Sequence, residues 1–289
     1  GFSRISVNPS LSIIYKLNYA WRFTAHASYK ERYGEMTDLY DRPYQTDYRN
    51  SVWNCGILPV YRQQLYSVYG EYKNTAREFF ATVNLTHNRE WYNRIYEQRI
   101  ENGQVQRVSL PLSNHGSGYT VKSTLSKGFY ELGLKTSFLV LLNISKAEQI
   151  SGGQRLPYQY RLMRLEPKVI WTPNRHWETS YQTDIRYGGN KIGERTRLAP
   201  LWNVTQQVQL SYIFSPIEAS LSVDHYHNDV NEDQSVNAVF ADFSVSWKSG
   251  RWQITATATN LFDKRTYAYT RYASLESYTS WVRIRPREF

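Results

Sequence analysis

The chain has 289 residues, a formal net charge of +10 and a mean hydropathy of −0.62. No stretch reaches the roughly 18 uninterrupted apolar residues of a membrane helix, but a membrane-spanning strand would escape such a scan because its apolar residues alternate with polar ones. The single cysteine, Cys55, excludes an intrachain disulfide framework and a zinc site built on cysteines. The basic residues are spread along the chain without a recognition helix, so nucleic acid is not an expected partner.

Apolar and polar residues alternate along most of the chain. In residues 252–259 every even position is apolar and every odd position is polar, and similar patterns recur in residues 177–187, 204–214, 217–224 and 239–247. A period of two places one set of side chains on each face of a sheet, and no segment shows the period of a helix. The sequence therefore predicts an all-β, antiparallel fold. About thirteen strands are expected, at residues 3–16, 21–33, 62–73, 78–92, 119–128, 131–146, 160–172, 177–187, 200–214, 217–228, 237–247, 251–261 and 277–287.

Short turns and long polar connections alternate between these strands. The short turns are expected at residues 18–20, 74–77, 128, 173–175, 215–216 and 248–251. The long connections are expected at residues 34–56, 93–118, 147–159, 188–199, 229–236 and 263–277. Outer-membrane barrels are built in this way, with short turns in the periplasm and long loops outside. The pattern therefore favours an antiparallel transmembrane β-barrel.

Aromatic residues make up 16% of the chain and include 25 Tyr and 9 Trp. Both residue types favour strands and membrane–water interfaces, where one end of the ring is apolar and the other is wet. Several of them lie beside the expected short turns. We therefore predict an outward-facing aromatic belt at that end of the sheet, formed by Trp21, Trp171, Trp177, Trp247 and Trp252.

A soluble sandwich or propeller is the alternative all-β fold. Aromatic residues beside turns would then cap a core between two sheets, and the predicted belt would be buried. The intervals between tight turns shrink from about 57 to about 33 residues, which is not the fixed repeat of a propeller. Exposure or burial of the belt distinguishes the two interpretations.

The odd number of expected strands indicates part of a barrel. Single-chain bacterial barrels have an even number of strands, with both ends in the periplasm. We therefore expect further strands before Gly1 and no pairing between the first and last strands of this chain. An unpaired edge in hydrocarbon would cost several kcal/mol for each unsatisfied backbone group.

One motif near the end of the chain carries a family resemblance. Residues 259–267 read Thr-Asn-Leu-Phe-Asp-Lys-Arg-Thr-Tyr, and the signature positions are Asn260, Leu261, Phe262, Asp263, Lys264 and Tyr267. This segment resembles the signature near the end of TonB-dependent outer-membrane receptors, where it closes the penultimate strand. The terminal aromatic Phe289 is similar to the insertion signal of such barrels. The abundance of tyrosine and the long loops look most like the SusC-type or peptide-receptor branches.

The last predicted strand departs from the family pattern. Arg283, Arg285 and Arg287 share the parity of Phe289, at positions where the family usually has apolar residues. Pro286 cannot donate to a ladder and favours a bulge, which would return Phe289 to the lipid face. The terminal insertion signal is therefore the weakest part of the resemblance.

The resemblance implies that residues 1–289 form the C-terminal portion of a barrel of 22 strands, without its plug domain and early strands. It implies a multi-pass location in the outer membrane, in contact with lipid and lipopolysaccharide. TonB would act through the missing plug, and a surface lipoprotein lid is a further partner of such receptors. No cofactor is implied.

The resulting functional hypothesis is an energised importer of a nutrient whose identity the sequence does not reveal. The alternative is a passive porin or a structural barrel subunit of a larger complex. No Ser/His or Asp/His set has catalytic spacing, so an enzyme is not expected. His225 and His227 share one face of a strand, but interfacial histidines explain them better than a metal site does.

Overall fold

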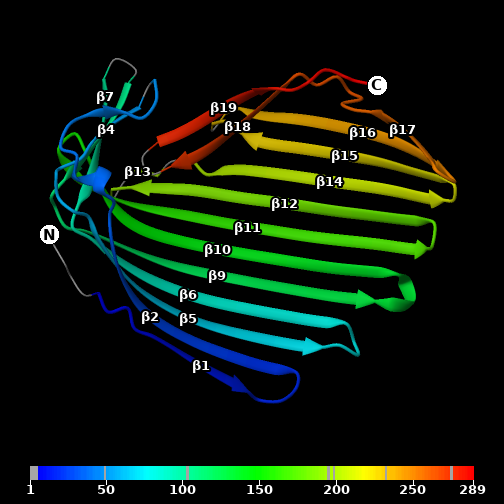
Figure 1. Cartoon of the computed structure of the whole chain (residues 1–289), viewed down its shortest axis with the longest axis horizontal. Coiled ribbons are helices and arrows are strands. Elements are labelled where there is room, and N and C mark those ends of the chain that lie inside the picture. The colour runs from blue at the N-terminus through cyan, green and yellow to red at the C-terminus, as the bar shows by residue number, and fades with distance from the viewer. Residues whose placement is uncertain are drawn as a thin grey trace.

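The alternating sequence forms one curved wall of antiparallel strands (Figure 1). The computed structural model describes residues 6–48, 50–101, 104–193, 196–197, 199–231, 233–273 and 276–289. The strands of the wall are β1 (Ser10–Lys16), β2 (Trp21–Tyr33), β5 (Val60–Asn74), β6 (Phe79–Tyr92), β9 (Asn114–Phe129), β10 (Leu134–Ser151), β11 (Gln154–Asn174), β12 (Trp177–Ile192), β14 (Leu201–Phe214), β15 (Ile217–Asp229), β16 (Ser235–Ser249) and β17 (Trp252–Ala258). Each pairs with the next in this order, which confirms the all-β, antiparallel fold.

The cross-strand register gives the wall two chemically different faces. Tyr72 pairs with Ala81, Ala81 with Leu125, and Leu125 with Phe138, so one apolar set of residues continues from strand to strand. We call this the apolar face. Its exposed members include Ile13, Phe23, Val68, Leu85, Leu125, Phe138, Trp177, Tyr181, Phe243 and Ile254. The opposite, polar face carries Arg22, Thr82, Asn143, Asp184, Gln209, Ser220 and Thr257.

The six predicted short turns all lie at one end of the wall, at the right of Figure 1. The third of them is displaced from residue 128, because β9 continues to Phe129 and a 3-10 turn, η2 (Tyr130–Leu132), makes the reversal. Gly133 closes that turn in the left-handed region at φ 60°. The short turns join neighbouring strands, so they fix the register that the apolar face requires.

The opposite end of the wall carries the longer connections, which contain structure of their own. They hold η1 (Met36–Leu39), β3 (Tyr44–Gln45), β4 (Asn50–Trp53), β7 (Ile95–Glu101), β8 (Gln104–Leu110) and β13 (Thr196–Arg197). Two short parallel contacts occur here, between β4 and β8 and between β7 and β10. The expectation of antiparallel pairing throughout is therefore wrong for the loops, because loops from separate hairpins meet side by side.

One predicted long connection is a tight hairpin. Residues 147–159 were expected to form a loop, but β10 and β11 continue through them to a two-residue turn at Gly152 and Gly153. Both glycines have positive φ, at 58° and 75°, as a type I′ hairpin turn requires. The sequence predicted a loop because these parts of β10 and β11 extend beyond the apolar face and carry polar residues on both sides.

The thirteenth predicted strand does not extend the wall. Residues 266–273 and 276–283 form a separate hairpin, β18 (Thr266–Ala273) and β19 (Glu276–Arg283), which pair with each other. Figure 1 shows this hairpin above β14 and β15. The chain then returns to the end of β17 through a bridge between Thr259 and Glu288, which lies beside the middle of β16. The prediction of a descending strand at 277–287 is therefore wrong, since local alternation did not reveal which strand is the partner.

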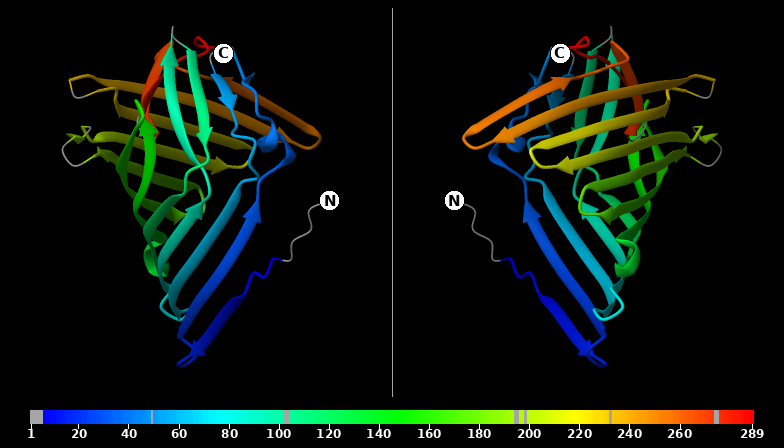
Figure 2. Two further views of the ribbon diagram at one scale, coloured as in Figure 1. Left: turned by 90° about the vertical axis from the view of Figure 1, so that its left-hand side faces the viewer. Right: turned by 90° about the vertical axis from the view of Figure 1, so that its right-hand side faces the viewer.

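The wall does not close in the part of the chain that the structure describes. There β1 pairs only with β2, β17 pairs only with β16, and β19 pairs with β18 rather than with β1. Figure 2 shows the resulting curved, open sheet from its two ends. This confirms the expectation that the first and last strands do not pair.

The most buried side chains are concentrated at the loop end. Ile95, Val108 and Ile150 are 0%, 7% and 4% exposed and come from two loop strands and the outer end of β10. Ala268 of the C-terminal hairpin is also 0% exposed. The wall itself is a single layer with two accessible faces, so the loops supply much of the packed interior. No helix among the described residues is long and apolar enough to cross a membrane.

Substitution of Gly133 by alanine is expected to destabilise the sheet more than the same change at Gly152. Both have nearly the same positive φ, which costs a residue with a Cβ roughly 1–2 kcal/mol. A Cβ at Gly133 would lie 2.0 Å from the carbonyl oxygen of Thr172, whereas one at Gly152 would meet nothing within 4 Å. Denaturant unfolding followed by tryptophan fluorescence measures both costs. Equal losses would contradict the turn geometry.

Candidate functional site

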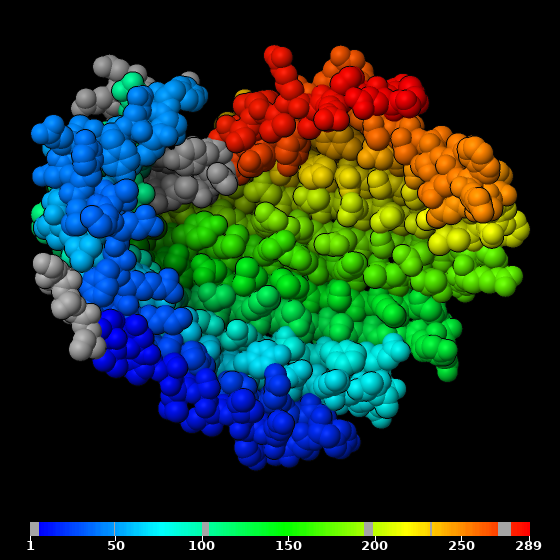
Figure 3. Space-filling view, viewed as in Figure 1, coloured from blue at the N-terminus to red at the C-terminus, as the bar shows by residue number. Residues whose placement is uncertain are grey.

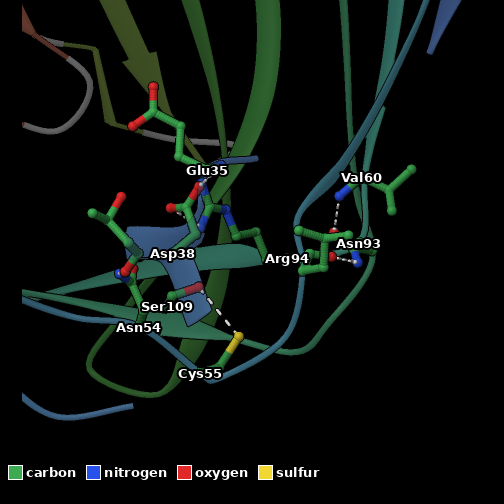
Figure 4. A network of polar contacts seen from close by, with 10 residues as sticks. Glu35, Asp38, Asn54, Cys55, Val60, Asn93, Arg94 and Ser109 are labelled. Carbon is green, nitrogen blue, oxygen red and sulfur yellow. Dashed lines mark hydrogen bonds and ion pairs between the residues drawn. The ribbon is translucent and has the colours of Figure 1, made fainter. Parts of the chain in front are cut away.

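The first two long loops are locked together at the loop end by hydrogen bonds (Figure 4). Asn93 donates from Nδ2 to the carbonyl of Leu58 at 2.9 Å and accepts from the backbone N–H of Val60 at 2.8 Å. Within the first loop, the buried Asn54 donates to the carbonyl of Thr37 at 3.2 Å and stabilises that loop itself. These bonds satisfy backbone groups that would otherwise be orphaned where the loops pack together. The two loops therefore form one ordered body above the strands.

An ion pair joins the same two loops. The guanidinium of Arg94 donates to Oδ1 of Asp38 at 2.8 Å, and the backbone N–H of Glu35 donates to Oδ2 of Asp38 at 2.9 Å. Burial acts to raise the pKa of Asp38, but the hydrogen bonds from Arg94 and Glu35 outweigh it, and the pKa lies below its ordinary value. The carboxylate is therefore held ionised between the loops.

A buried carboxylate ties β7 to the tip of the β10–β11 hairpin. Glu97 is 5% exposed, pairs with Arg99 at 2.7 Å and accepts from the backbone N–H of Gly153 at 3.1 Å. Glu97 also stands opposite Ile150 in the short parallel contact. Two successive connections are thus joined through this side chain. The loops frame the hollowed face of the wall in Figure 3.

A cavity of about 750 Å³ lies between these loops and the polar face of β6, β9 and β10. Its lining includes Asn50, Val52, Glu90, Tyr92, Arg94, Tyr96, Arg107, Asn114, Ser145, Glu148 and Tyr158. It opens where the loop end meets the polar face. A polar cavity with several aromatic rings at this place is our candidate functional site.

Two guanidinium groups and one ring dominate the chemistry of this cavity. The guanidinium carbon of Arg107 lies 3.6 Å from the ring centroid of Tyr96, and that of Arg94 lies 5.0 Å from it. Arg94 is neutralised by Asp38, whereas Arg107 has no carboxylate within 4 Å among the described residues. Burial raises the pKa of Tyr96, although both arginines oppose the rise. Arg107 therefore offers the cavity a positive charge that no direct ion pair neutralises, although this charge also acts on nearby Asp38.

Glu90 supplies a carboxylate to the cavity that is already saturated with donors. It accepts hydrogen bonds from the hydroxyls of Tyr61 at 3.1 Å and Tyr92 at 2.8 Å. The side-chain amides of Gln63 and Asn88 donate to it at 3.1 and 2.9 Å. Four donors hold the carboxylate in place, so it organises the cavity floor and is poorly available to a cation.

The predicted belt residues all lie on the apolar face at the short-turn end. Trp21, Trp171, Trp177, Trp247 and Trp252 are between 38% and 74% exposed. Other rings extend the row, with Trp21 and Tyr72 at 4.8 Å between centroids and Trp177 and Tyr212 at 4.6 Å. The described residues form no second sheet against this face, so the sandwich alternative is not supported. Their role as interface anchors stays a prediction.

The family motif forms a clasp at the outer end of β17. Asn260 has a left-handed φ of 50°, and its side chain bonds the backbone of Lys264 in both directions, at 2.9 and 3.0 Å. It also donates to the carbonyl of Arg285 at 2.8 Å, while Asp263 accepts from the backbone N–H of Arg287 at 3.1 Å. Asn260 therefore bonds the local backbone, whereas Asp263 bonds the backbone of a residue distant in the chain.

The other motif residues lie around this clasp. The backbone N–H of Leu261 donates to the carbonyl of Ala241 at 2.8 Å, and Phe262 is 56% exposed. The ring of Tyr267 packs on Tyr226 at 5.2 Å and anchors the C-terminal hairpin to the polar face. Phe289 is 90% exposed and directly follows the bridge between Thr259 and Glu288.

The remaining candidates serve structural contacts. On the polar face Asp184 accepts two hydrogen bonds from the guanidinium of Arg164, both at 3.0 Å. His227 bonds the side chain of Asn237 at 2.9 Å and lies 3.4 Å from Asp229. Within the described ranges no three His, Cys, Asp or Glu side chains come close enough to hold a metal ion.

Sequence reasoning did not identify the residues of the cavity. Arg94, Tyr96 and Arg107 lie in the predicted long connection 93–118, and their pattern has no recognisable motif. The only available signal was compositional, since residues 93–118 contain three Arg and three Asn. That signal does not say which loop meets which.

Comparisons with known proteins give remote structural likenesses. The sequence matches no protein-family model and no curated protein. Similar solved structures include FpvA of P. aeruginosa bound to a heterologous pyoverdine–iron complex, with 10% identity and a TM-score of 0.49 over 91% of this chain and 40% of that chain. The FpvAI–pyocin S2 complex gives 10% identity and 0.49 over 91% and 41%. The translocator domain of the autotransporter NalP from Neisseria meningitidis gives 9% and 0.30 over 84% and 83%. The chain thus spans about 40% of the length of the first of these structures.

The order of the outer loops is expected to depend on pH through Asp38. Its folded pKa is lowered, so the ionised carboxylate stabilises the loops above about pH 4, and this contribution is lost as the pH falls through the folded pKa. Hydrogen-exchange protection of residues 34–40, corrected for the intrinsic rate, should fall on acidification. Asp38→Asn should have low protection at every pH, whereas Asp41→Asn should retain the transition. An unchanged transition in Asp38→Asn would refute the assignment.

Proposed function

We propose that this chain is the wall of a transport barrel in a bacterial outer membrane. The observation that carries the proposal is the continuous apolar face, whose large side chains remain exposed across all the strands of the wall. Soluble proteins rarely expose a contiguous apolar patch larger than a few hundred Å². Lipid is the partner that such a face requires, while the polar face would line a lumen.

The spacing of aromatic residues supports a membrane-spanning orientation. On β12, Trp177 at the short-turn end and Tyr187 at the loop end share the apolar face and are ten residues apart. At about 3.3 Å per residue and a strand tilt near 40°, that separation covers roughly 25 Å of membrane depth. Tyr187 packs on Trp202 at 4.8 Å, and His87 stacks on Tyr119 at 4.3 Å, so rings also border the loop end. Two aromatic margins are expected of such a barrel.

The loop cavity favours a receptor over a passive pore. A pore would share the apolar face and the polar lining, but it would not need loops locked into one body around a chemically distinct cavity. The charge of Arg107, which forms no direct ion pair among the described residues, and the neighbouring tyrosines suit a solute that carries an anionic group. We propose that the cavity takes part in capture of a nutrient at the cell surface, and we propose no catalytic step.

Energised import through TonB rests on the motif resemblance at residues 259–267. The clasp formed by Asn260 and Asp263 gives that motif a physical role, because it fixes the exit of β17. A SusC-like or peptide-receptor branch is proposed from the abundance of tyrosine and the long loops alone. A plug domain with a TonB-binding segment in the same polypeptide would support import, and further strands without a plug would support the porin alternative.

Arginine substitutions on neighbouring residues of β17 are expected to test which face meets lipid. Ala256 lies on the apolar face opposite Val245, and Thr257 lies on the polar face opposite Ser244. Ala256→Arg should cost roughly 2–4 kcal/mol of stability in bilayers, and Thr257→Arg should be nearly neutral. Folding equilibria in phospholipid vesicles measure both. Equal costs would contradict the proposed facing.

Membrane-impermeant thiol labelling of intact cells is expected to establish the orientation. With Cys55 replaced by serine, Met36→Cys in η1 and Tyr130→Cys in η2 present single thiols at opposite ends, at sites that are 85% and 89% exposed. The thiol at position 36 should react on intact cells, and the thiol at position 130 only after permeabilisation. The reverse pattern would overturn the orientation, and reaction of both in a soluble extract would overturn the membrane assignment.

A further inference from the structure

A row of polar and basic residues crosses the apolar face just beyond its aromatic margin. The register aligns Arg89 with Ser117, Ser117 with Lys146, Lys146 with Gln159, and Gln159 with Lys191. The row therefore crosses β6, β9, β10, β11 and β12 along the hydrogen-bonding direction. The adjacent row, two residues nearer the short turns, contains the stacked rings of Tyr66, His87 and Tyr119. Basic groups thus follow rings directly along the direction from the short turns to the loops.

The cations of this margin are not compensated. Lys146, Lys191 and the neighbouring Arg161 have no carboxylate within 4 Å among the described residues, and all three lie on the apolar face. The two acidic residues there are already paired. Their pairs are Glu31 with Arg62 at 2.8 Å and Glu148 with Arg155 at 3.0 Å. The margin therefore carries several free positive charges.

A pocket of about 320 Å³ lies in the same margin between β9 and β12. Its lining combines His115, Ser117, Lys146, Gln159 and Lys191 with the already paired Glu148. Ser117, Lys146 and Glu148 also border the loop cavity, so the two spaces are neighbours, and Lys191, Gln159 and His115 belong to the pocket on the apolar face. Lys146 and Lys191 stand two strands apart, about 10 Å at the backbone, and their flexible stems can converge on a ligand between them. Lysine and serine donors around a small pocket are suited to bind phosphate oxygens.

The apolar surface continues from this pocket toward the short turns. A shallow groove of about 600 Å³ runs over β1, β2, β5, β6 and β9, and Ala25, Ala27, Val68, Leu85 and Val121 contribute to its lining. Tyr119 of the groove and Ser117 of the pocket are two residues apart on the same face of β9. The small alanine side chains leave the groove open. Its shape and lining suit acyl chains.

We propose that the pocket binds the phosphate groups of an outer-leaflet lipid whose acyl chains lie on the apolar face below it. This inference rests on the proposed membrane orientation and adds a specific lipid site to it. A lipid is chosen over a free anion because the phosphate pocket and the apolar surface are continuous. The position at the loop end places the site in the outer leaflet, and a lipid with phosphorylated sugars fits two lysines better than a zwitterionic lipid does.

Native mass spectrometry of the whole protein in detergent micelles tests the proposal. The probes are bis-phosphorylated lipid A and its dephosphorylated form. Replacement of Lys146 and Lys191 together by glutamine should weaken binding of the phosphorylated probe by about tenfold or more. The matched control replaces Lys122 and Lys135, which lie on the polar face of β9 and β10, and removes the same charge. That control should bind as the unaltered protein does.

Further measurements separate the possible failures. Heat-dependent migration on gels reports folding of each variant, and replacement of Lys146 and Lys191 by arginine should preserve binding because it preserves charge. Equal binding of both lipid A forms, or no loss in the glutamine variant, would overturn the proposal. Competition by millimolar inorganic phosphate would show a free-anion site and overturn the lipid assignment. The Ala256 and Thr257 comparison tests membrane facing independently, so failure of the lipid site is distinguishable from failure of the membrane proposal.

Discussion

The structure depends on a register that keeps residues of one parity on one face from β1 to β17. A slip of one residue in any ladder would transfer every apolar side chain beyond it to the polar face. Six short turns between neighbouring strands limit such slips. The register shift between Trp171 and Asn174 is confined to the residues beside the short turn that joins β11 to β12. The exposed apolar face, the polar face and the loop cavity all follow from this one constraint. As a consequence, the wall has no packed interior of its own, and many of the buried side chains belong to the loops.

The wall could be predicted from the sequence because a period of two is a local property. Residues 252–258 show their two faces without reference to any neighbour, and the same holds for most strands. The partners of a strand are not local. Residues 276–283 also form a strand, yet they pair with β18, and this hairpin packs over the polar face, where Asn228 donates to Tyr267 at 3.0 Å. The parts of β10 and β11 nearest the loop end could not be predicted for a related reason. Their residues are polar on both faces, so no alternation of apolar and polar residues marks them as strands.

The candidate site could be predicted only where a motif fixes short-range geometry. Asn260 bonds Lys264, four residues away, and the expected Asx chemistry was sufficient to identify that contact. Arg94 and Asp38 are 56 residues apart and meet only because two separate loops converge. No periodicity connects them, and each alone looks like a solvated charge. The loop cavity is therefore a product of tertiary structure. Its chemistry depends on the position of Arg107, which lies over the ring of Tyr96 and forms no direct ion pair among the described residues.

The structure shows where the residues behind the net charge of +10 lie and which of them form ion pairs. On the polar face the arginines near mid-wall are largely consumed, as Arg164 and Arg186 both bond Asp184. The cations that form no ion pair among the described residues include three at the loop end, with Arg107 in the cavity and Lys146 and Lys191 in the pocket on the apolar face. A charge at this end of the wall can be solvated, whereas a charge within a lipid-facing apolar band would not be. The loop end therefore has two surfaces that attract anions, which we propose to serve a solute and the surrounding membrane.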